Sequence, residues 1–484
     1  MTQHYLIALL TAGAAWGTLT FPAVARDAVP DGAVFFPGQP SFGVNIHTPG
    51  YGPKISALGA RWVRWGVSWA DVEKQPGVYD FSRADMIVAD FQKNQLKILN
   101  CIGLHDLNPV RPDPRKDLPG YLAAMTAFTR ATVAHYRGRV AVWEIGNEPE
   151  TCMAEVFNKP ETYVQVARAL AKAIREADPK AHVGALSVAW MDRPFISRCL
   201  ELGLLADGTI DILTFHGYHR TNLMPESGLE TDVAWLRAQA AAHAPPGKRV
   251  IVIDSERGYA IHPFLTPKLW DNWRNIVYSE TEQAAYLARH YLEEIQLGIE
   301  ISIWYKDMWG EANFSLYEGG PDSRLRPMGV AMRNLAARLP DNPKEMVNTR
   351  YAVSVAPAGA VEVRSFLVRP RGAGRTDRLV VALWNPVEAF DGRFLQSRQK
   401  IGDSFYEAWR AASPEDVIAR PVTVTLAKTS RMTATGAVAV DLLAADGAKA
   451  AQALPVTDHG ATLVTGEVKA GPVPTLLVFE LTPN

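Results

Sequence analysis

Two glutamates each follow a run of apolar residues, a placement typical of catalytic carboxylates. Glu148 stands in the segment VWEIGNEPE (142–150), where an apolar stretch stops on a carboxamide, a carboxylate and a proline. Pro149 disfavours the helical conformation at Glu148 and lacks the N–H that would extend a sheet. Glu256 ends the β-branched segment RVIVIDSE (249–256). The sequence therefore predicts two strands that each present a glutamate at their end.

A pair of facing carboxyl groups suits the hydrolysis of glycosidic bonds. One carboxylic acid protonates the leaving oxygen, while the other carboxylate attacks the anomeric carbon or activates water. The two roles require different pKa values. Direct attack, which retains the anomeric configuration, needs the two carboxyls about 5–5.5 Å apart, whereas activation of a water, which inverts it, needs a wider gap.

These motifs resemble those of the clan A glycoside hydrolases, and within the clan they are closest to family 39 and related polysaccharide hydrolases. In that clan the acid/base lies in an Asn-Glu-Pro after the fourth strand, and the nucleophile ends the seventh. Asn147, Glu148 and Pro149 match the first motif, and Glu256 matches the second. The resemblance, over residues 40 to 340, implies Glu256 as nucleophile, Glu148 as acid/base, and a retaining mechanism. It calls for no cofactor and no metal.

Arg64 lies within the apolar segment WVRWG (62–66), where an unpaired charge would be costly. In the resembled clan an arginine of the second strand lies beside the nucleophile, where it would keep Glu256 ionised. The alternative is an ion pair with a structural acid such as Asp71 or Glu73.

Three further residues match positions that bind substrate or nucleophile in the clan. His216 and Tyr218 follow the sixth strand, and the tyrosine would hydrogen-bond the nucleophile; the alternative is a histidine satisfied in the barrel wall and a packing aromatic. Asn147 would hydrogen-bond the sugar 2-hydroxyl, or else serve only as a turn residue. The resemblance departs at Gly146, where the clan often has tryptophan.

Aromatic residues and histidines at strand ends are further candidates for substrate binding, because flat apolar sugar faces stack on aromatic rings. Trp304 matches the clan best, whereas any other single tryptophan is as compatible with the core. The candidates are Trp69, Trp190, Trp304, Trp309, His47 and His105. A metalloenzyme that uses His47, His105 and His216 is an alternative, but the His-Glu-x-x-His type of spacing is missing.

Eight short apolar segments alternate with helical segments over about 300 residues, which favours parallel β-α units and a closed (β/α)8 TIM barrel over residues 26–341. An open doubly wound sheet is the alternative, but no Gly-x-Gly-x-x-Gly turn follows the first strand. One predicted helix, Pro160–Ala177, shows a clear three-to-four residue apolar period. The predicted strands are Ser41–His47, Trp62–Val67, Leu96–Ile102, Val140–Gly146, His182–Ala189, Asp211–Phe215, Arg249–Ile253 and Ile301–Tyr305.

The sequence pattern changes over residues 342–484, where short segments of alternating apolar and polar residues are separated by Gly, Pro and Asn/Asp turns. This pattern predicts a C-terminal β-sandwich domain. Such a domain either binds carbohydrate or supports the barrel. The segment Arg350–Val355 fits either domain. The other predicted strands are Leu379–Trp384, Val422–Leu426, Ala437–Leu443 and Thr475–Leu481.

The composition supports a two-domain protein with a neutral substrate. The chain has 484 residues, 48% of them hydrophobic, and a formal net charge of -1. This balance argues against a nucleic-acid or anionic-membrane partner and fits a carbohydrate. Residues 1–25 combine an apolar stretch with the small residues Ala23-Val24-Ala25, so we expect a removed secretion signal and a secreted or periplasmic protein. No later segment is long enough to span a bilayer.

Three cysteines allow at most one disulfide bond in an oxidising compartment. Cys101 lies in an apolar strand and is expected to be a buried small hydrophobe. Whether Cys152 and Cys199 pair stays open at this point, as does the choice between a hydrolase, a transglycosylase on the same scaffold and a non-catalytic carbohydrate-binding protein.

Overall fold

In the computed structural model, all the secondary structure discussed below belongs to one compact unit, Val34–Asn484. The predicted secretion signal, Cys152 and Trp309 lie outside the described residues. The described residues are 35–36, 42–47, 49–105, 107–151, 155–218, 224–261, 276–277, 280–307, 314–318, 324–339, 346–348, 353–359, 361–368, 376–386, 419–427, 432–447 and 449–483.

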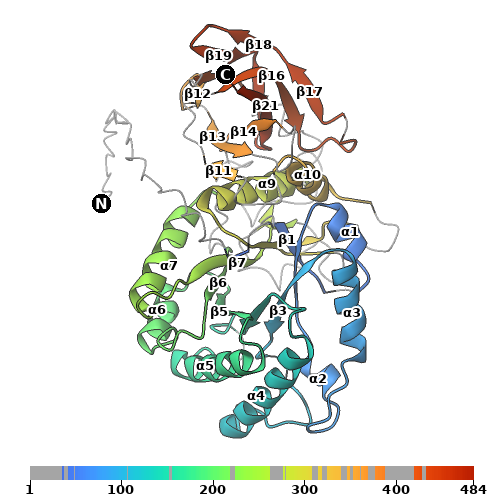
Figure 1. Ribbon diagram of the computed structural model, residues 1–484, viewed down its shortest axis with the longest axis vertical. Helices are drawn as coiled ribbons and strands as arrows, with labels where there is room; N and C mark the ends of the chain where they lie inside the picture. Colours follow the sequence, from blue (N-terminus) through green and yellow to red (C-terminus); the bar gives the residue numbers. More distant parts are fainter. Residues whose placement is uncertain are drawn as a thin grey trace, which may run out of the picture. The chain divides into compact units, whose positions relative to one another are not determined.

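Eight parallel strands close into a barrel, in the order β1-β10-β7-β6-β5-β4-β3-β2, and β2 pairs again with β1 (Figure 1). Each strand falls on a predicted one, so the closed barrel is confirmed and the open sheet is wrong. The strands are β1 (Phe42–Asn45), β2 (Trp62–Trp65), β3 (Lys97–Ile102), β4 (Val142–Ile145), β5 (His182–Val188), β6 (Ile212–His216), β7 (Ile251–Arg257) and β10 (Ser302–Trp304). The prediction stopped β7 at Ile253, four residues early.

Helices surround the barrel (Figure 1). Helix α5 has the predicted bounds, and its apolar period is buried against the strands. Gly298, at φ +68°, follows the last residue of α9, a position where glycine is favoured. The helices are α1 (Gly52–Ala57), α2 (Trp69–Val72), α3 (Ser82–Lys93), α4 (Leu118–His135), α5 (Pro160–Ala177), α6 (Arg193–Glu201), α7 (Leu229–His243), α9 (Glu280–Leu297) and α10 (Pro327–Ala336). In the part of the chain that the structure describes, no helix is both long and apolar enough to cross a membrane.

The barrel interior changes from apolar to polar along the strands. One end is filled by apolar side chains that include Trp62, Ile253 and Ile303. Towards the carboxyl ends of the strands the buried residues become polar and charged, among them Arg64 and Glu144. In a (β/α)8 barrel this face carries the functional loops. A small parallel pair, β8 (Ala260–Ile261) and β9 (Ile276–Val277), follows β7.

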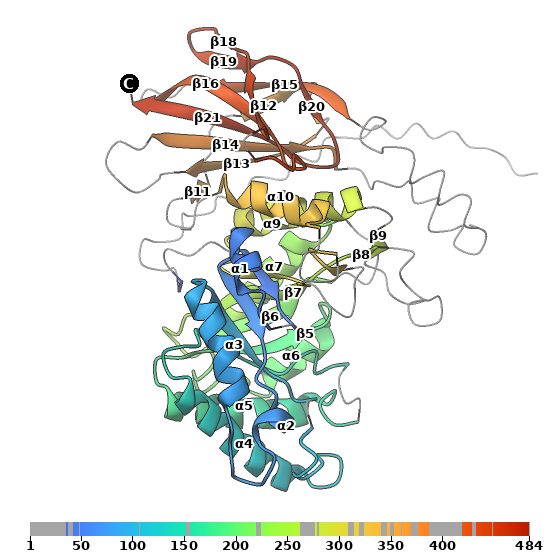
Figure 2. The same cartoon turned by 90° about the vertical axis from the view of Figure 1, so that its right-hand side faces the viewer.

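The C-terminal strands form two antiparallel sheets that share one apolar core, as predicted for a β-sandwich (Figure 2). Strand β12 pairs with β15, so the ambiguous segment belongs to this part of the chain. One sheet contains β11 (Met346–Asn348), β13 (Glu362–Val368), β14 (Asp377–Trp384), β21 (Thr475–Pro483), β16 (Met432–Asp441) and β17 (Ala451–Leu454). The other contains β12 (Val353–Ala356), β15 (Arg420–Ala427), β19 (Thr462–Thr465) and β18 (Val456–Asp458), with β20 (Val468–Ala470) on β15.

Polar contacts join these sheets to the helices α9 and α10. Arg364 of β13 pairs with Glu293 of α9 over 2.7 Å. Asn334 of α10 donates to the backbone carbonyl of Leu442 over 3.0 Å. Both pairs are largely buried, so they fasten the C-terminal strands to the helical layer of the barrel.

Candidate active site

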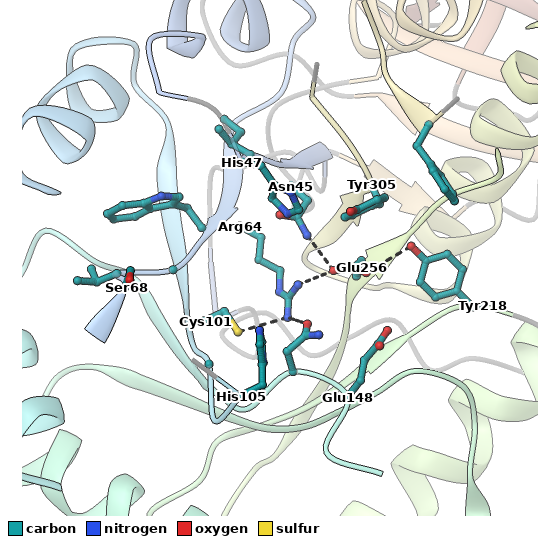
Figure 3. Close-up of a pocket in the computed structure, with 17 residues that line it drawn as sticks. Asn45, His47, Arg64, Ser68, Cys101, His105, Glu148, Tyr218, Glu256 and Tyr305 are labelled. Atoms are coloured by element: carbon teal, nitrogen blue, oxygen red, sulfur yellow. Dashed lines mark hydrogen bonds and ion pairs between the residues drawn. The ribbon is translucent and has the colours of Figure 1, made fainter. Parts of the chain in front are cut away.

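A cavity of about 530 Å³ lies at the carboxyl ends of the barrel strands (Figure 3). This volume falls within the ordinary range of small-molecule sites. Its lining combines two carboxylates, an arginine, two histidines and several aromatic rings. The lining residues are Asn45, Ile46, His47, Arg64, Trp65, Gly66, Val67, Ser68, Cys101, Gly103, His105, Asn147, Glu148, Tyr218, Glu256, Tyr305 and Phe314.

Glu148 and Glu256 face each other across this cavity. One carboxylate oxygen of each residue lies within 4.8 Å of the other, and His216 Nδ1 lies 2.9 Å from Glu148 Oε1 and 3.8 Å from Glu256 Oε1. Glu148 follows β4 and keeps 24% of its side chain exposed, whereas the side chain of Glu256 on β7 is only 11% exposed. Glu256 thus lies deeper in the site than Glu148.

Arg64 of β2 binds Glu256. Its Nη1 donates to Glu256 Oε2 over 2.6 Å, and its Nε donates to Glu144 Oε2 over 2.7 Å. Its Nη2 donates to Asn147 Oδ1 over 2.7 Å. The guanidinium therefore contacts β4 through Glu144, the segment after β4 through Asn147, and β7 through Glu256.

The alternative partners of Arg64 are engaged elsewhere. Asp71 pairs with Lys74 and Arg83 at the surface, and Glu73 pairs with Arg111. Arg64 is 4% exposed, so its charge is buried. The carboxylates of Glu144 and Glu256 offset the free-energy cost of burying that charge.

Two further donors reach Glu256. Asn45 of β1 donates from Nδ2 to Glu256 Oε2 over 2.8 Å, and the hydroxyl of Tyr218 donates to Oε1 over 3.4 Å. Burial and the nearby Glu256 raise the pKa of Tyr218 well above 10, so its hydroxyl stays a donor. Sequence reasoning missed Asn45, although a polar residue within an apolar first strand was a usable signal.

His216 lies beneath Glu148. Its Nδ1 is 2.9 Å from Glu148 Oε1, and its Nε2 is 2.9 Å from the hydroxyl oxygen of Ser187. Ser187 was missed because the pairing of β5 with β6 shifts by one residue between Leu186 and Val188, which turns Ser187 towards the site. Ser187 has φ +47°, a conformation that few residues other than glycine adopt.

The segment that carries Glu148 has an unusual backbone. Gly146 has φ +90° and Glu148 has φ +48°. Many clan members have tryptophan where this chain has Gly146. The φ of Gly146 explains the difference, because a tryptophan would be strained in that conformation. The N–H of Glu148 donates to the carbonyl of Ser187 over 2.8 Å and holds the turn against β5. Such positive φ values outside glycine concentrate at functional sites.

The three titratable groups of the site shift each other's pKa values. Burial raises the pKa of Glu256. Burial alone would also raise the pKa of Glu148, but the hydrogen bond from His216 holds it below its ordinary value. Burial would lower the pKa of His216, yet Glu256 and Glu148 raise it. The opposite shifts of Glu148 and His216 favour an ion pair between them, in which the imidazolium of His216 carries the proton of their hydrogen bond.

Two predicted tryptophans do not line the cavity. Trp304 is 1% exposed and points outwards, where its ring packs against His290 and Tyr291 of α9. The next residue, Tyr305, lines the cavity instead, because side chains alternate along a strand. Trp190 is partly buried and is absent from the lining. Neither tryptophan therefore contributes to the wall of this cavity, and substrate binding by Trp304 and Trp190 stays a prediction.

Trp69 also belongs to the core. It is buried in α2 and stacks on Phe128 with ring centroids 5.6 Å apart. The aromatic surface of the cavity comes instead from Trp65, Tyr218, Tyr305 and Phe314.

His47 and His105 do line the cavity, as predicted. Lys306 Nζ lies 3.1 Å from His47 Nδ1. Burial, followed by the charges of Lys306 and Arg64, lowers the pKa of His47 to about 4. His47 is therefore a neutral hydrogen-bonding group at physiological pH.

Metal binding at the two glutamates would compete with existing hydrogen bonds. Glu148, His216 and Glu256 offer three ligand atoms within 4.8 Å of one another. However, both ring nitrogens of His216 already have partners, Glu148 and Ser187. Glu256 Oε2 accepts from Arg64 and Asn45. The donor set therefore fits an organic substrate better than an ion.

Neither Cys101 nor Cys199 forms a disulfide bond among the residues that the structure describes. Cys199 is buried in α6, and Cys101 reaches the cavity wall, 3.5 Å from Arg64 Nη2. Cys101 was expected to be fully buried, and this is wrong because its strand end opens into the cavity.

Comparison with known proteins supports the fold. No family model matches the chain, and no curated protein matches it either. Among solved structures, a family 39 glycoside hydrolase from Bacteroides cellulosilyticus WH2 aligns with TM-score 0.61 and 16% identity, over 92% of this chain and 81% of that one. A monomeric β-xylosidase from Caulobacter crescentus CB15 aligns with TM-score 0.59 and 16% identity, over 92% and 97%. A glucosidase from Croceicoccus marinus aligns with TM-score 0.59 and 15% identity, over 92% and 96%. The chain thus has the barrel-and-sandwich fold of these structures.

Proposed function

We propose that the protein is a retaining glycoside hydrolase that cleaves β-glycosidic bonds of an oligosaccharide or polysaccharide. The observation that carries this proposal is the pair Glu148 and Glu256, whose oxygens lie within 4.8 Å of each other in a cavity. Retaining glycosidases need carboxyls about 5–5.5 Å apart, whereas inverting enzymes need about 6.5–9.5 Å for an intervening water. The close spacing supports direct attack by one carboxylate on the sugar.

Glu256 is the proposed nucleophile. Arg64, Asn45 and Tyr218 all donate hydrogen bonds to its carboxylate, and Arg64 adds a positive charge. These donors oppose the effect of burial and orient the attacking oxygens. Attack by Glu256 on the anomeric carbon would expel the leaving sugar and form a glycosyl-enzyme, which water then hydrolyses.

Glu148 is the proposed acid and base. It is the more exposed carboxyl, as a group that reaches the leaving oxygen and then an incoming water must be. The lowered pKa of Glu148 and the raised pKa of His216 favour a proton on the histidine in the free site. His216 would pass this proton to Glu148 along their hydrogen bond, and Glu148 would pass it on to the glycosidic oxygen. Asn147, whose oxygen is engaged by Arg64, would turn its amide donors towards the sugar 2-hydroxyl.

Turnover of aryl glycosides tests this function. Two of the structures with this fold are a β-xylosidase and a glucosidase, so aryl β-xylosides and β-glucosides are the first substrates to assay, followed by purified polysaccharides. NMR of the first-formed product gives its anomeric configuration, and we expect β. An α product would remove the retaining mechanism. Products longer than the substrate would identify a transglycosylase, and sugar binding without turnover would identify a binding protein.

Export is part of the proposal. The apolar N-terminal segment and the small residues before residue 26 are its basis. N-terminal sequencing of the protein from the medium or periplasm of an expressing bacterium should give a start near residue 26. An intact Met1 in the cytoplasm would contradict export without affecting the catalytic proposal.

A further inference from the structure

Strand β7 contains an irregularity at the proposed nucleophile. Phe215 of β6 pairs with Asp254, but the next residue, His216, pairs with Glu256. On the other side, Ser302 of β10 pairs with Asp254, while Trp304 pairs with Arg257. Strand β7 therefore carries one more residue than both of its neighbours over this stretch, which defines a β-bulge.

This bulge decides which way Glu256 points. Ile251 and Ile253 fill the barrel interior, so strict alternation would turn Glu256, three positions after Ile253, outwards to the helices. Glu256 instead lines the cavity. A one-residue slip reverses the face of every following side chain, so the extra residue aims the carboxylate inwards.

Asp254 holds the bulge from outside the barrel. Its Oδ1 accepts the N–H of Glu256 over 3.2 Å and the N–H of Gly217, at the end of β6, also over 3.2 Å. Asp254 is fully buried. One carboxylate oxygen thus joins the backbone of the bulge to the strand end between His216 and Tyr218.

Gly217 makes room for this carboxylate. A Cβ at residue 217 would lie 2.4 Å from Asp254 Oδ2 and 2.9 Å from Arg257 Nη1, distances too short for non-bonded atoms. Only glycine therefore lets Asp254 approach the backbone of β6.

A buried polar cluster supports Asp254 from α9. His290 Nε2 lies 3.4 Å from Asp254 Oδ2 and 3.1 Å from Glu294 Oε2. All three residues are at most 1% exposed. Burial and the neighbouring Glu294 raise the pKa of Asp254 to about 7, so a neutral amide resembles the native group. The cluster packs beside Oδ2 of Asp254, while Oδ1 is directed at the two backbone amides.

We propose that Asp254 is a positioning residue: its hydrogen bonds to the amides of Glu256 and Gly217 fix the β7 bulge and thereby aim Glu256 at the substrate. The reaction part of this inference rests on the proposed glycosidase function. Asp254 itself does not line the cavity described above, and the proposal gives it no part in proton transfer. Its contribution is to keep Glu256 within reach of Arg64 and Asn45.

Three variants test the proposal. Asp254→Ala removes the acceptor, and Gly217→Ala displaces the carboxylate without changing its charge. Both should lower kcat by about 100-fold with little change in KM, since a displacement of about 1 Å can cost that much. Asp254→Asn retains an acceptor oxygen and should stay within about tenfold of the parent. Asp211→Ala is the matched control, because Asp211 is a buried acid that accepts the N–H of Val183 over 3.0 Å, where β5 and β6 begin.

The outcomes separate positioning from simple stability. A loss of kcat in D254A and G217A, with rescue in D254N and parental kcat in D211A, supports the proposal. Parental kcat in D254A, or an equal kcat loss in D211A at equal thermal stability, overturns it. If D254A fails to fold, G217A and D254N decide the question by the same criteria.

If the parent protein hydrolyses no glycoside, the proposed function is wrong, but the positioning role of Asp254 can still be tested by structure. Crystal structures of G217A and D254A would then show whether Glu256 has left Arg64 and Asn45. A carboxylate displaced by about 1 Å or more supports the positioning role, and an unmoved one refutes it.

Discussion

The guanidinium of Arg64 on β2 donates a hydrogen bond over 2.6 Å to Glu256 on β7, although β1 and β10 separate these two strands in the barrel. The same guanidinium pairs with Glu144, which is fully buried. Burial disfavours the charge of Arg64, but Glu144 and Glu256 raise its pKa. Arg64 therefore has a catalytic and a structural partner, and its two roles can be separated by mutation.

Arg64→Ala should lose turnover and also stability. The variant leaves Glu144 as a buried unpaired charge, which costs roughly 3–5 kcal/mol in comparable cases. Adding Glu144→Gln removes that charge and should restore much of the free energy of unfolding, measured in denaturant, without restoring kcat. A double variant with parental kcat would make Arg64 purely structural.

The Glu256→Ala and Glu148→Ala variants should differ in their residual activity and in how it depends on the leaving group. Glu256→Ala loses the attacking group, so it should be inert on every substrate, although azide should restore slow turnover with inverted product. Glu148→Ala loses protonation of the leaving group, so dinitrophenyl glycosides should suffer much less than natural linkages. Stopped-flow assays should show a burst of dinitrophenolate followed by a stall that azide relieves with retained product.

The opposite pattern would reverse the two roles. In that case the Glu256 variant would show the burst and the leaving-group dependence, while the Glu148 variant would lose activity uniformly. Circular dichroism of both variants should match the parent, since each substitution removes a carboxyl at the cavity surface rather than a core group.

His216→Gln should move the alkaline limb of the kcat/KM profile to lower pH. The pKa of His216 is raised from 6.5 because Glu256 and Glu148 oppose the effect of its burial, and Glu148 alone holds a proton less tightly than the pair. The same ion pair stabilises the fold fully between pH 4.5 and 6.5, and it is lost as the pH rises through the raised pKa of His216 or falls through the lowered pKa of Glu148. His135→Gln, at a partly exposed histidine on α4, is the control. An unchanged alkaline limb would separate His216 from proton delivery.

Glu150→Gln should flatten the pH dependence of stability. Burial raises the pKa of Glu150 from 4.5 to about 7, so its contribution to stability is fully present below pH 4.5 and is lost as the pH rises through 7. Each pKa unit corresponds to about 1.4 kcal/mol, so the effect between pH 5 and 8 is on the order of 2–3 kcal/mol. Thermal melts at several pH values measure it. Glu176→Gln, at a site with a 45% exposed side chain, should leave the slope unchanged, and an equally steep slope in both variants would refute the assignment.

Much of the barrel could be predicted because its signals are local. Each strand is a continuous apolar run between polar turns, and parallel strands buried on both faces require such runs. Glu148 and Glu256 stood out since each interrupts an apolar run at its end. Arg64 was predictable for the same reason, because a charge inside a buried strand must find an anion.

The tertiary structure decided which neighbour of each predicted residue reaches the cavity. Tyr305 lines the cavity instead of Trp304, and Ser187 and Glu256 turn inwards at bulges in β5 and β7. A bulge arises from the pairing of a strand with its neighbours, which lie tens of residues away in the chain, so the period of a single strand cannot reveal it. The sequence alone determined the barrel strands and the strand ends that carry Glu148 and Glu256, because buried strands need continuous apolar runs. The register between paired strands determined the direction of the Glu256 side chain and the residues that hydrogen-bond to the two carboxylates.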